Sequence, residues 1–196
     1  DMLLLVSPNG GRKTALAKIF AATLFLLLTS LWFSFLDLIG FAASFQTFEG
    51  LALPVFAIPN FAEASVNLSI FQYVLLSAAL KCAGAWVMGM LWLLVSMFWK
   101  NALLPFVIDF ALCMALIVSG AACAYSNFFW TKVLNPYSLL TNRVLLGKTE
   151  FVNLGGFPVL TWQAAIWFAL IAGLAAAAMI YFLSAENCHR CVRRAK

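Results

Sequence analysis

Three charged side chains interrupt long apolar stretches of this sequence, and they are the residues best placed for chemistry. Asp37, Lys81 and Asp109 each lie among residues that are almost all hydrophobic. Ionisable residues inside a membrane are costly, so they commonly mark ion pathways, proton relays or buried pairs. We expect Asp37 and Lys81 at compatible depths, where they can pair, and Asp109 nearer the opposite surface. The sequence leaves open whether these charges serve transport or only the stability of a helical bundle.

The residues that most enzymes use are scarce. The single histidine, His189, lies in the C-terminal segment beside Cys188 and Cys191, and neither an H-E-x-x-H nor a G-x-S-x-G motif is present. One C-x-x-C without a second pair of ligands is a weak zinc signal, so we interpret this segment as a disordered basic tail. We predict no catalytic residue, no metal and no cofactor, and we do not expect an enzyme.

A glycine-rich basic segment near the N-terminus resembles the end of a phosphate-binding loop. It reads Gly10-Gly11-Arg12-Lys13-Thr14, and a true P-loop needs a glycine directly before the lysine and another five residues earlier. Arg12 and Ser7 occupy those two positions. We therefore predict a basic turn that leads into a membrane helix, and no binding of ATP by this chain itself.

The composition requires lipid around most of the chain. The 196 residues are 65% hydrophobic and 10% charged, whereas soluble domains are nearer half apolar and a quarter charged. Four apolar segments exceed the roughly 20 residues that a spanning helix needs. They cover about residues 17–44, 70–99, 102–125 and 161–184. The sequence predicts an all-α, polytopic transmembrane helical bundle that forms a single domain over residues 1–196.

The connections between these segments predict further organisation. Residues 99–101 form so short a turn that the second and third spans must make an antiparallel hairpin. Residues 126–160 are long and semi-apolar, and we expect short helices in the outer leaflet before the last span. A basic cytoplasmic tail is expected over residues 185–196.

Lysine and arginine are distributed unevenly along the chain. With the N-terminus in the cytoplasm, eight of the twelve lie inside, and Lys81 lies within a span. The three on the outside are Lys132, Arg143 and Lys148. The positive-inside rule therefore places both termini in the cytoplasm. The net charge of +5 is attributed to topology signals and contact with anionic lipid rather than to nucleic-acid binding.

Several ordered features resemble one family of membrane proteins. Residues 7–18, Ser-Pro-Asn-Gly-Gly-Arg-Lys-Thr-Ala-Leu-Ala-Lys, look like the cytoplasmic segment of bacterial permease subunits of ATP-binding cassette transporters, the type-2 exporter class. Similar features follow at Leu53-Pro54, at Ile58-Pro59-Asn60-Phe61, at Phe98-Trp99-Lys100-Asn101 and at residues 134–140, Leu-Asn-Pro-Tyr-Ser-Leu-Leu. The resemblance covers nearly the whole chain.

The resemblance implies a function and a set of partners. The chain would be the C-terminal part of a six-span permease in the bacterial cytoplasmic membrane, with ATP hydrolysis on a separate subunit. Arg12, Lys13 and Lys18 would then be candidates to contact that ATPase subunit. A second copy of the permease, or a homologous one, would complete the transporter.

Two other functions remain open. An ion-coupled secondary transporter or channel would use Asp37, Lys81 and Asp109, although the inverted repeats common in such proteins are not apparent. A membrane scaffold or sensor subunit would need none of the charges for transport. The transported substrate is not identified by the sequence.

Overall fold

Four long helices form the body of the protein. The computed structural model describes residues 10–45, 49–58, 61, 63–64, 67–99, 103–124 and 129–194. Within these ranges, the long helices are α2 (Gly10–Phe45), α3 (Ile70–Ser96), α4 (Leu103–Ala124) and α8 (Thr161–Arg194). Each contains a stretch long and apolar enough to cross a membrane. The predicted all-α transmembrane bundle is therefore confirmed.

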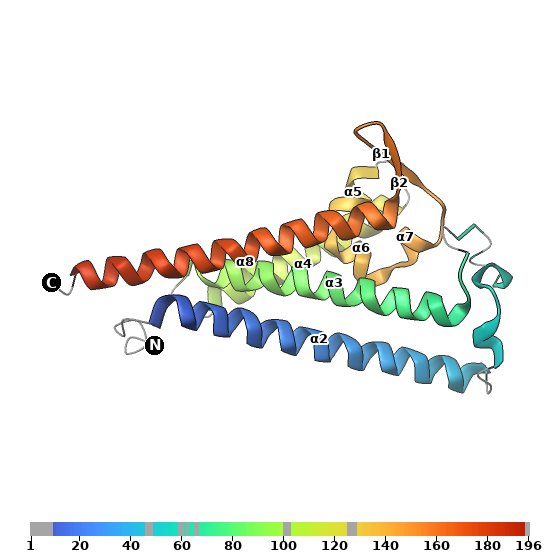
Figure 1. Cartoon of the computed structure of the whole chain (residues 1–196), viewed down its shortest axis with the longest axis horizontal. Coiled ribbons are helices and arrows are strands. Elements are labelled where there is room, and N and C mark those ends of the chain that lie inside the picture. The colour runs from blue at the N-terminus through green and yellow to red at the C-terminus, as the bar shows by residue number, and fades with distance from the viewer. Residues whose placement is uncertain are drawn as a thin grey trace.

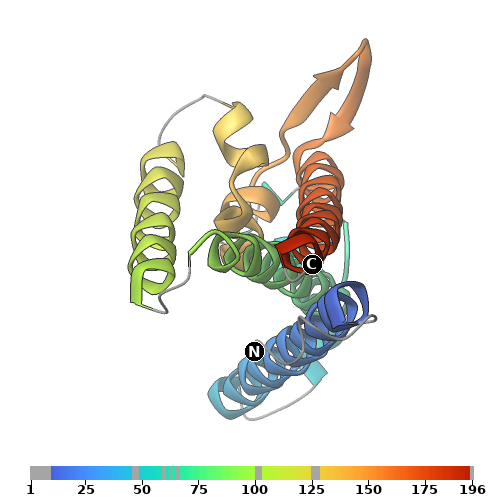
Figure 2. The same cartoon turned by 90° about the vertical axis from the view of Figure 1, so that its left-hand side faces the viewer.

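Helix α3 lies at the centre of the arrangement. It contacts α2, α8, α4 and the short helix α6 (Pro136–Thr141), and Figure 2 shows α4 standing apart from α2 and α8. The first turn of α2 and the last turn of α8 lie at the same end of the molecule (Figure 1). Most residues of α2 and α4 are exposed, with only 6% of each apolar window buried, so these helices present their surfaces to lipid or to further helices.

Both helical ends of the chain extend further than the sequence indicated. Helix α2 begins at Gly10, where we expected a basic turn, and the span was expected from about residue 17. Helix α8 continues to Arg194, although we expected a disordered tail after residue 184. In each case an apolar helix continues into polar residues, because each added residue gains a backbone hydrogen bond once the costly nucleus exists.

Side-chain caps fix the beginning of α3. The Ser69 hydroxyl accepts a hydrogen bond from the Gln72 backbone N–H, and the Gln72 side chain accepts one from the Ser69 N–H. This capping box satisfies backbone donors that have no partner within the helix. The preceding segment, with the 3₁₀ helices η1 (Glu49–Ala52) and η2 (Val55–Ala57), pairs with the start of α3 through an isolated bridge between Pro54 and Ser69.

The segment before the last span contains short helices, as predicted. They are α5 (Phe129–Leu134), α6, and α7 (Arg143–Leu146). A β-hairpin that we did not predict follows, with strands β1 (Phe151–Leu154) and β2 (Phe157–Leu160). Its two-residue turn has φ of 62° at Gly155 and 98° at Gly156, the type I′ geometry that favours glycine.

Close helix contacts are made around Trp86 of α3. Its indole N–H donates a hydrogen bond of 3.1 Å to the Thr23 hydroxyl on α2. On the side of α8, the same ring fills the space beside Gly173, where an added Cβ would lie 2.4 Å from a ring carbon. One tryptophan therefore joins three of the four spans.

Candidate functional site

An ion pair joins α2 to α3 within the spans. Lys81 donates a hydrogen bond to the Asp37 carboxylate, so the pairing that the sequence allowed is formed. The Lys81 side chain is 29% exposed and the Asp37 side chain 58%, which leaves the pair accessible at the helix surface rather than enclosed in the bundle. At membrane depth this pairing lowers the free-energy cost of placing the two charges in the bilayer.

The helix registers explain why these two residues meet. Lys81 lies eleven residues after Ile70 in α3, and Asp37 lies eight residues before Phe45 in α2. At a rise of about 1.5 Å per residue, they are roughly 12–16 Å from the same end of the bundle. Because the two helices are neighbours that run antiparallel (Figure 1), this spacing brings the two charges to one level along the bundle, where they pair.

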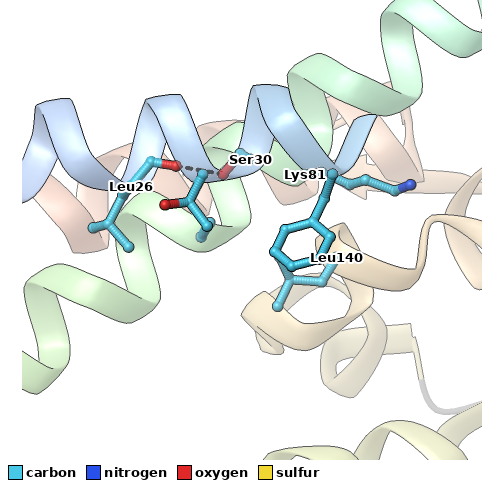
Figure 3. Close-up of a pocket in the computed structure, with 7 residues that line it drawn as sticks. Leu26, Ser30, Lys81 and Leu140 are labelled. Atoms are coloured by element: carbon cyan, nitrogen blue, oxygen red, sulfur yellow. Dashed lines mark hydrogen bonds between the residues drawn. The ribbon is translucent and has the colours of Figure 1, made fainter. Parts of the chain in front are cut away.

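A pocket lies beside the Lys81 side chain (Figure 3). Its volume is about 190 Å³, and its walls are almost entirely carbon. It is lined by Leu26, Thr29, Ser30 and Phe33 of α2, Lys81 and Ala85 of α3, and Leu140 of α6. Leu140 therefore brings the short helix α6 into the same site as two of the spans.

The polar groups around the pocket differ in how many partners they have. The Thr29 hydroxyl donates to the Phe25 carbonyl at 2.8 Å, and the Ser30 hydroxyl donates to the Leu26 carbonyl at 2.7 Å. Both hydroxyl protons are therefore used within α2. The Lys81 ammonium has three donors, and the residues that the structure describes supply one acceptor, Asp37. The site thus combines an apolar pocket with one incompletely paired cation.

Asp109 does not join this site. It lies on α4, and within the described ranges it forms no ion pair with another residue. Its Oδ1 atom is buried and has no hydrogen-bond partner there, and the Trp92 indole nitrogen of α3 is in the same condition. The three intramembrane charges are therefore a pair and a separate carboxylate, not one cluster.

The basic residues expected to contact an ATPase lie at the start of α2. Lys13 and Lys18 are exposed there, while the Arg12 side chain lies outside the described part of the structure. At the same end, residues 185–194 of α8 carry Cys188, His189 and Cys191, whose side chains are likewise outside the described part.

A second ion pair, which was not predicted from the sequence, joins α5 to the start of the hairpin. Lys132 of α5 is buried, and its ammonium donates to both carboxylate oxygens of Glu150, at 2.8 and 3.0 Å. We had interpreted Lys132 only as an outside charge. The two residues are eighteen positions apart and belong to no periodic pattern, so their opposite charges were the only available signal.

Two asparagines whose structural role was not predicted attach the short helices to the spans. The Asn135 amide donates to the Leu116 carbonyl of α4 at 2.9 Å and to the Ser119 hydroxyl at 3.2 Å. The Asn142 amide donates to the carbonyl and hydroxyl of Ser77 in α3, at 3.0 and 2.7 Å. Segment 129–146 is therefore fixed to α3 and α4 by side-chain hydrogen bonds as well as by apolar packing.

The fold and the charged pair at membrane depth define a polytopic α-helical membrane protein. Comparison with protein families, curated proteins and solved structures finds no match for this chain.

Proposed function

We propose that this chain is the membrane-spanning part of a permease subunit of an ATP-driven exporter of the ATP-binding cassette class. ATP hydrolysis takes place on a partner subunit, and the helical bundle moves a substrate across the bacterial cytoplasmic membrane. A second copy of the subunit, or a homologous permease, completes the transport path.

The observation that carries this proposal is the basic end of the molecule. The first turns of α2 carry Arg12, Lys13 and Lys18, and the last turns of α8 carry Arg190, Arg193 and Arg194. At this same end α8 continues ten residues past its apolar window, which ends at Ser184, and α2 begins three residues before its own, which starts at Lys13 (Figure 1). Helices that carry basic residues at one end of the bundle suit an acidic soluble partner, and they would transmit its movement into the spans.

The test is co-purification of the ATPase subunit with the full-length gene product in detergent. Replacing Arg12→Glu and Lys13→Glu together reverses two charges at the proposed contact, and we expect retention of the ATPase to weaken roughly tenfold or more. Lys148→Glu is the matched control, because Lys148 is exposed in the segment at the opposite end of the spans. Intact ATPase retention in the double variant would contradict the proposed contact.

The ion pair at membrane depth supports a second candidate, an ion-coupled transporter or channel. Paired Asp and Lys residues within spans are a common means of coupling ion movement to transport. In that case, ion-gradient-driven uptake into vesicles should be lost in Asp37→Asn while no ATPase co-purifies. Transport that depends on ATP and not on an ion gradient would favour the exporter.

A further inference from the structure

The pocket beside Lys81 takes no part in the proposed ATPase contact. We propose that it binds the hydrocarbon chain of an amphiphile whose anionic head group binds the Lys81 ammonium. If the amphiphile is a transported substrate, this site gives the substrate class of the proposed exporter, and to that extent it rests on the proposed function. The binding site itself requires only the geometry of α2, α3 and α6.

The walls of the pocket select a hydrocarbon chain. Leu26, Phe33, Ala85 and Leu140 contribute only carbon, and the neighbouring hydroxyl protons are already donated within α2. A polar solute would therefore lose most of its hydrogen bonds with water on entering the pocket. A volume of about 190 Å³ exceeds the roughly 150 Å³ of an apolar cavity that binds benzene, so a segment of an acyl chain fits.

The Lys81 ammonium selects a negatively charged head group. It gives one hydrogen bond to Asp37, and its remaining donors have no acceptor among the described residues. Carboxylate or phosphate oxygens form short, charge-assisted bonds with such donors, and these bonds are stronger than neutral ones. The Lys81 side chain is itself 29% exposed, so a ligand oxygen can approach the ammonium beside Asp37.

The positions along α2 give the ligand a direction. The pocket extends from Leu26 to Phe33, and the level of the ion pair is about one helical turn beyond, at Asp37. In Figure 3 the Lys81 nitrogen lies at the end of the group furthest from Leu26. The head group therefore faces the end of the bundle that carries α5 to α7, and the chain points into the membrane, as in a lipid of that leaflet.

The test is native mass spectrometry of the full-length protein, titrated with dodecanoate and, in parallel, with uncharged dodecanol. We expect dodecanoate to bind. Lys81→Met should lower the affinity for dodecanoate roughly ten- to a hundredfold, because the hydrogen-bonded charge pair between the carboxylate and the ammonium is lost. Ala85→Leu fills the pocket and should weaken both ligands. Ala79→Leu adds the same volume on an exposed position of the same helix and should change neither.

A second variant guards against misfolding of Lys81→Met, which leaves Asp37 unpaired. The double variant Asp37→Asn/Lys81→Met removes both charges and should still lose the preference for dodecanoate over dodecanol. Equal binding of the two ligands by wild type would overturn the assignment of the head group to Lys81. Unchanged binding in Ala85→Leu would overturn the assignment of the chain to the pocket.

A second experiment distinguishes a bilayer lipid from a transported amphiphile. Protein in nanodiscs of phosphatidylglycerol or phosphatidylcholine is extracted, and the retained lipid is identified. Phosphatidylglycerol retained through Lys81 identifies a bilayer lipid, whereas dodecanoate that displaces it and stimulates ATP hydrolysis identifies a transported amphiphile. Lys81-dependent binding without any co-purifying ATPase would support this site and contradict the proposed exporter.

Discussion

At the scale of single residues, two pairs of opposite charges, Asp37–Lys81 and Lys132–Glu150, are formed between different elements of the bundle. The sequence was sufficient to select Asp37 and Lys81, because charges in apolar runs are rare and helix length fixes their depth. It could not show the pocket beside them, since Leu140 comes from a short helix almost sixty residues further along the chain. It also could not find the Lys132–Glu150 pair, which depends on how α5 meets the start of the hairpin.

Removing either partner of the Lys132–Glu150 pair should lower stability, but by different amounts. Lys132 has an 8% exposed side chain and Glu150 a 34% exposed one, so Glu150→Met leaves a buried ammonium, whereas Lys132→Met leaves a carboxylate that reaches water. We expect Glu150→Met to lower the free energy of unfolding by about 1–3 kcal/mol and Lys132→Met by less. Thermal unfolding in detergent measures both.

The controls for this pair are the double variant and an exposed lysine. Lys132→Met/Glu150→Met removes both charges and should be more stable than Glu150→Met alone. Lys148→Met should unfold like wild type, because Lys148 is exposed. A larger loss in Lys132→Met than in Glu150→Met would show that the burial of the ammonium does not determine the cost.

At the scale of elements, the apolar runs predicted the four spans. They did not predict the helix ends, because α2 and α8 continue into polar residues. Helix α8 carries Glu186, His189 and three arginines in its last turns. A hydropathy pattern predicts that the helix ends before such residues. The β-hairpin did carry a signal, the Gly155-Gly156 turn between short apolar strands. We had predicted only short helices in residues 126–160 and no strand.

At the contact between α3 and α8, we expect a glycine-to-alanine change to destabilise the protein, although alanine has the higher helix propensity. Gly173→Ala would normally stabilise a helix by up to about 1 kcal/mol. Here the added methyl group meets Trp86 at 2.4 Å, so we expect a loss of about 1–3 kcal/mol from overpacking. Thermal unfolding measures the change, and tryptophan fluorescence reports any displacement of the ring.

Gly40→Ala is the matched control for Gly173→Ala. Gly40 also lies in a spanning helix, and a Cβ added there meets no atom within 4 Å. It should leave stability unchanged or raise it slightly. If the two variants behaved alike, the close approach of α8 to Trp86 would not be a stability determinant.

At the scale of the whole molecule, the arrangement of the helices places the start of α2 and the end of α8 on one side (Figure 1). The charge count predicts that this side is cytoplasmic. Segment 129–160, with its short helices and hairpin, then lies at the outer surface, joined to the spans through Asn135 and Asn142.

Single-cysteine labelling checks this topology in intact cells. In a cysteine-free background, Lys148→Cys should react with a membrane-impermeant maleimide, and Lys13→Cys should react only after the membrane is permeabilised. Both positions are exposed, so a difference in reaction reports the side of the membrane rather than burial in the protein. Reaction of both residues in intact cells would contradict the four-span arrangement.

The turn of the β-hairpin has a consequence for changing the length of this chain. Gly155 and Gly156 are exposed, and a Cβ added at either would meet no atom within 4 Å. Residues inserted between them would extend into open space, and the penalty would be mainly loop-closure entropy, about 0.6 kcal/mol for each doubling of loop length. The hairpin turn is therefore a position where a peptide epitope can be inserted without disturbing the long apolar helices.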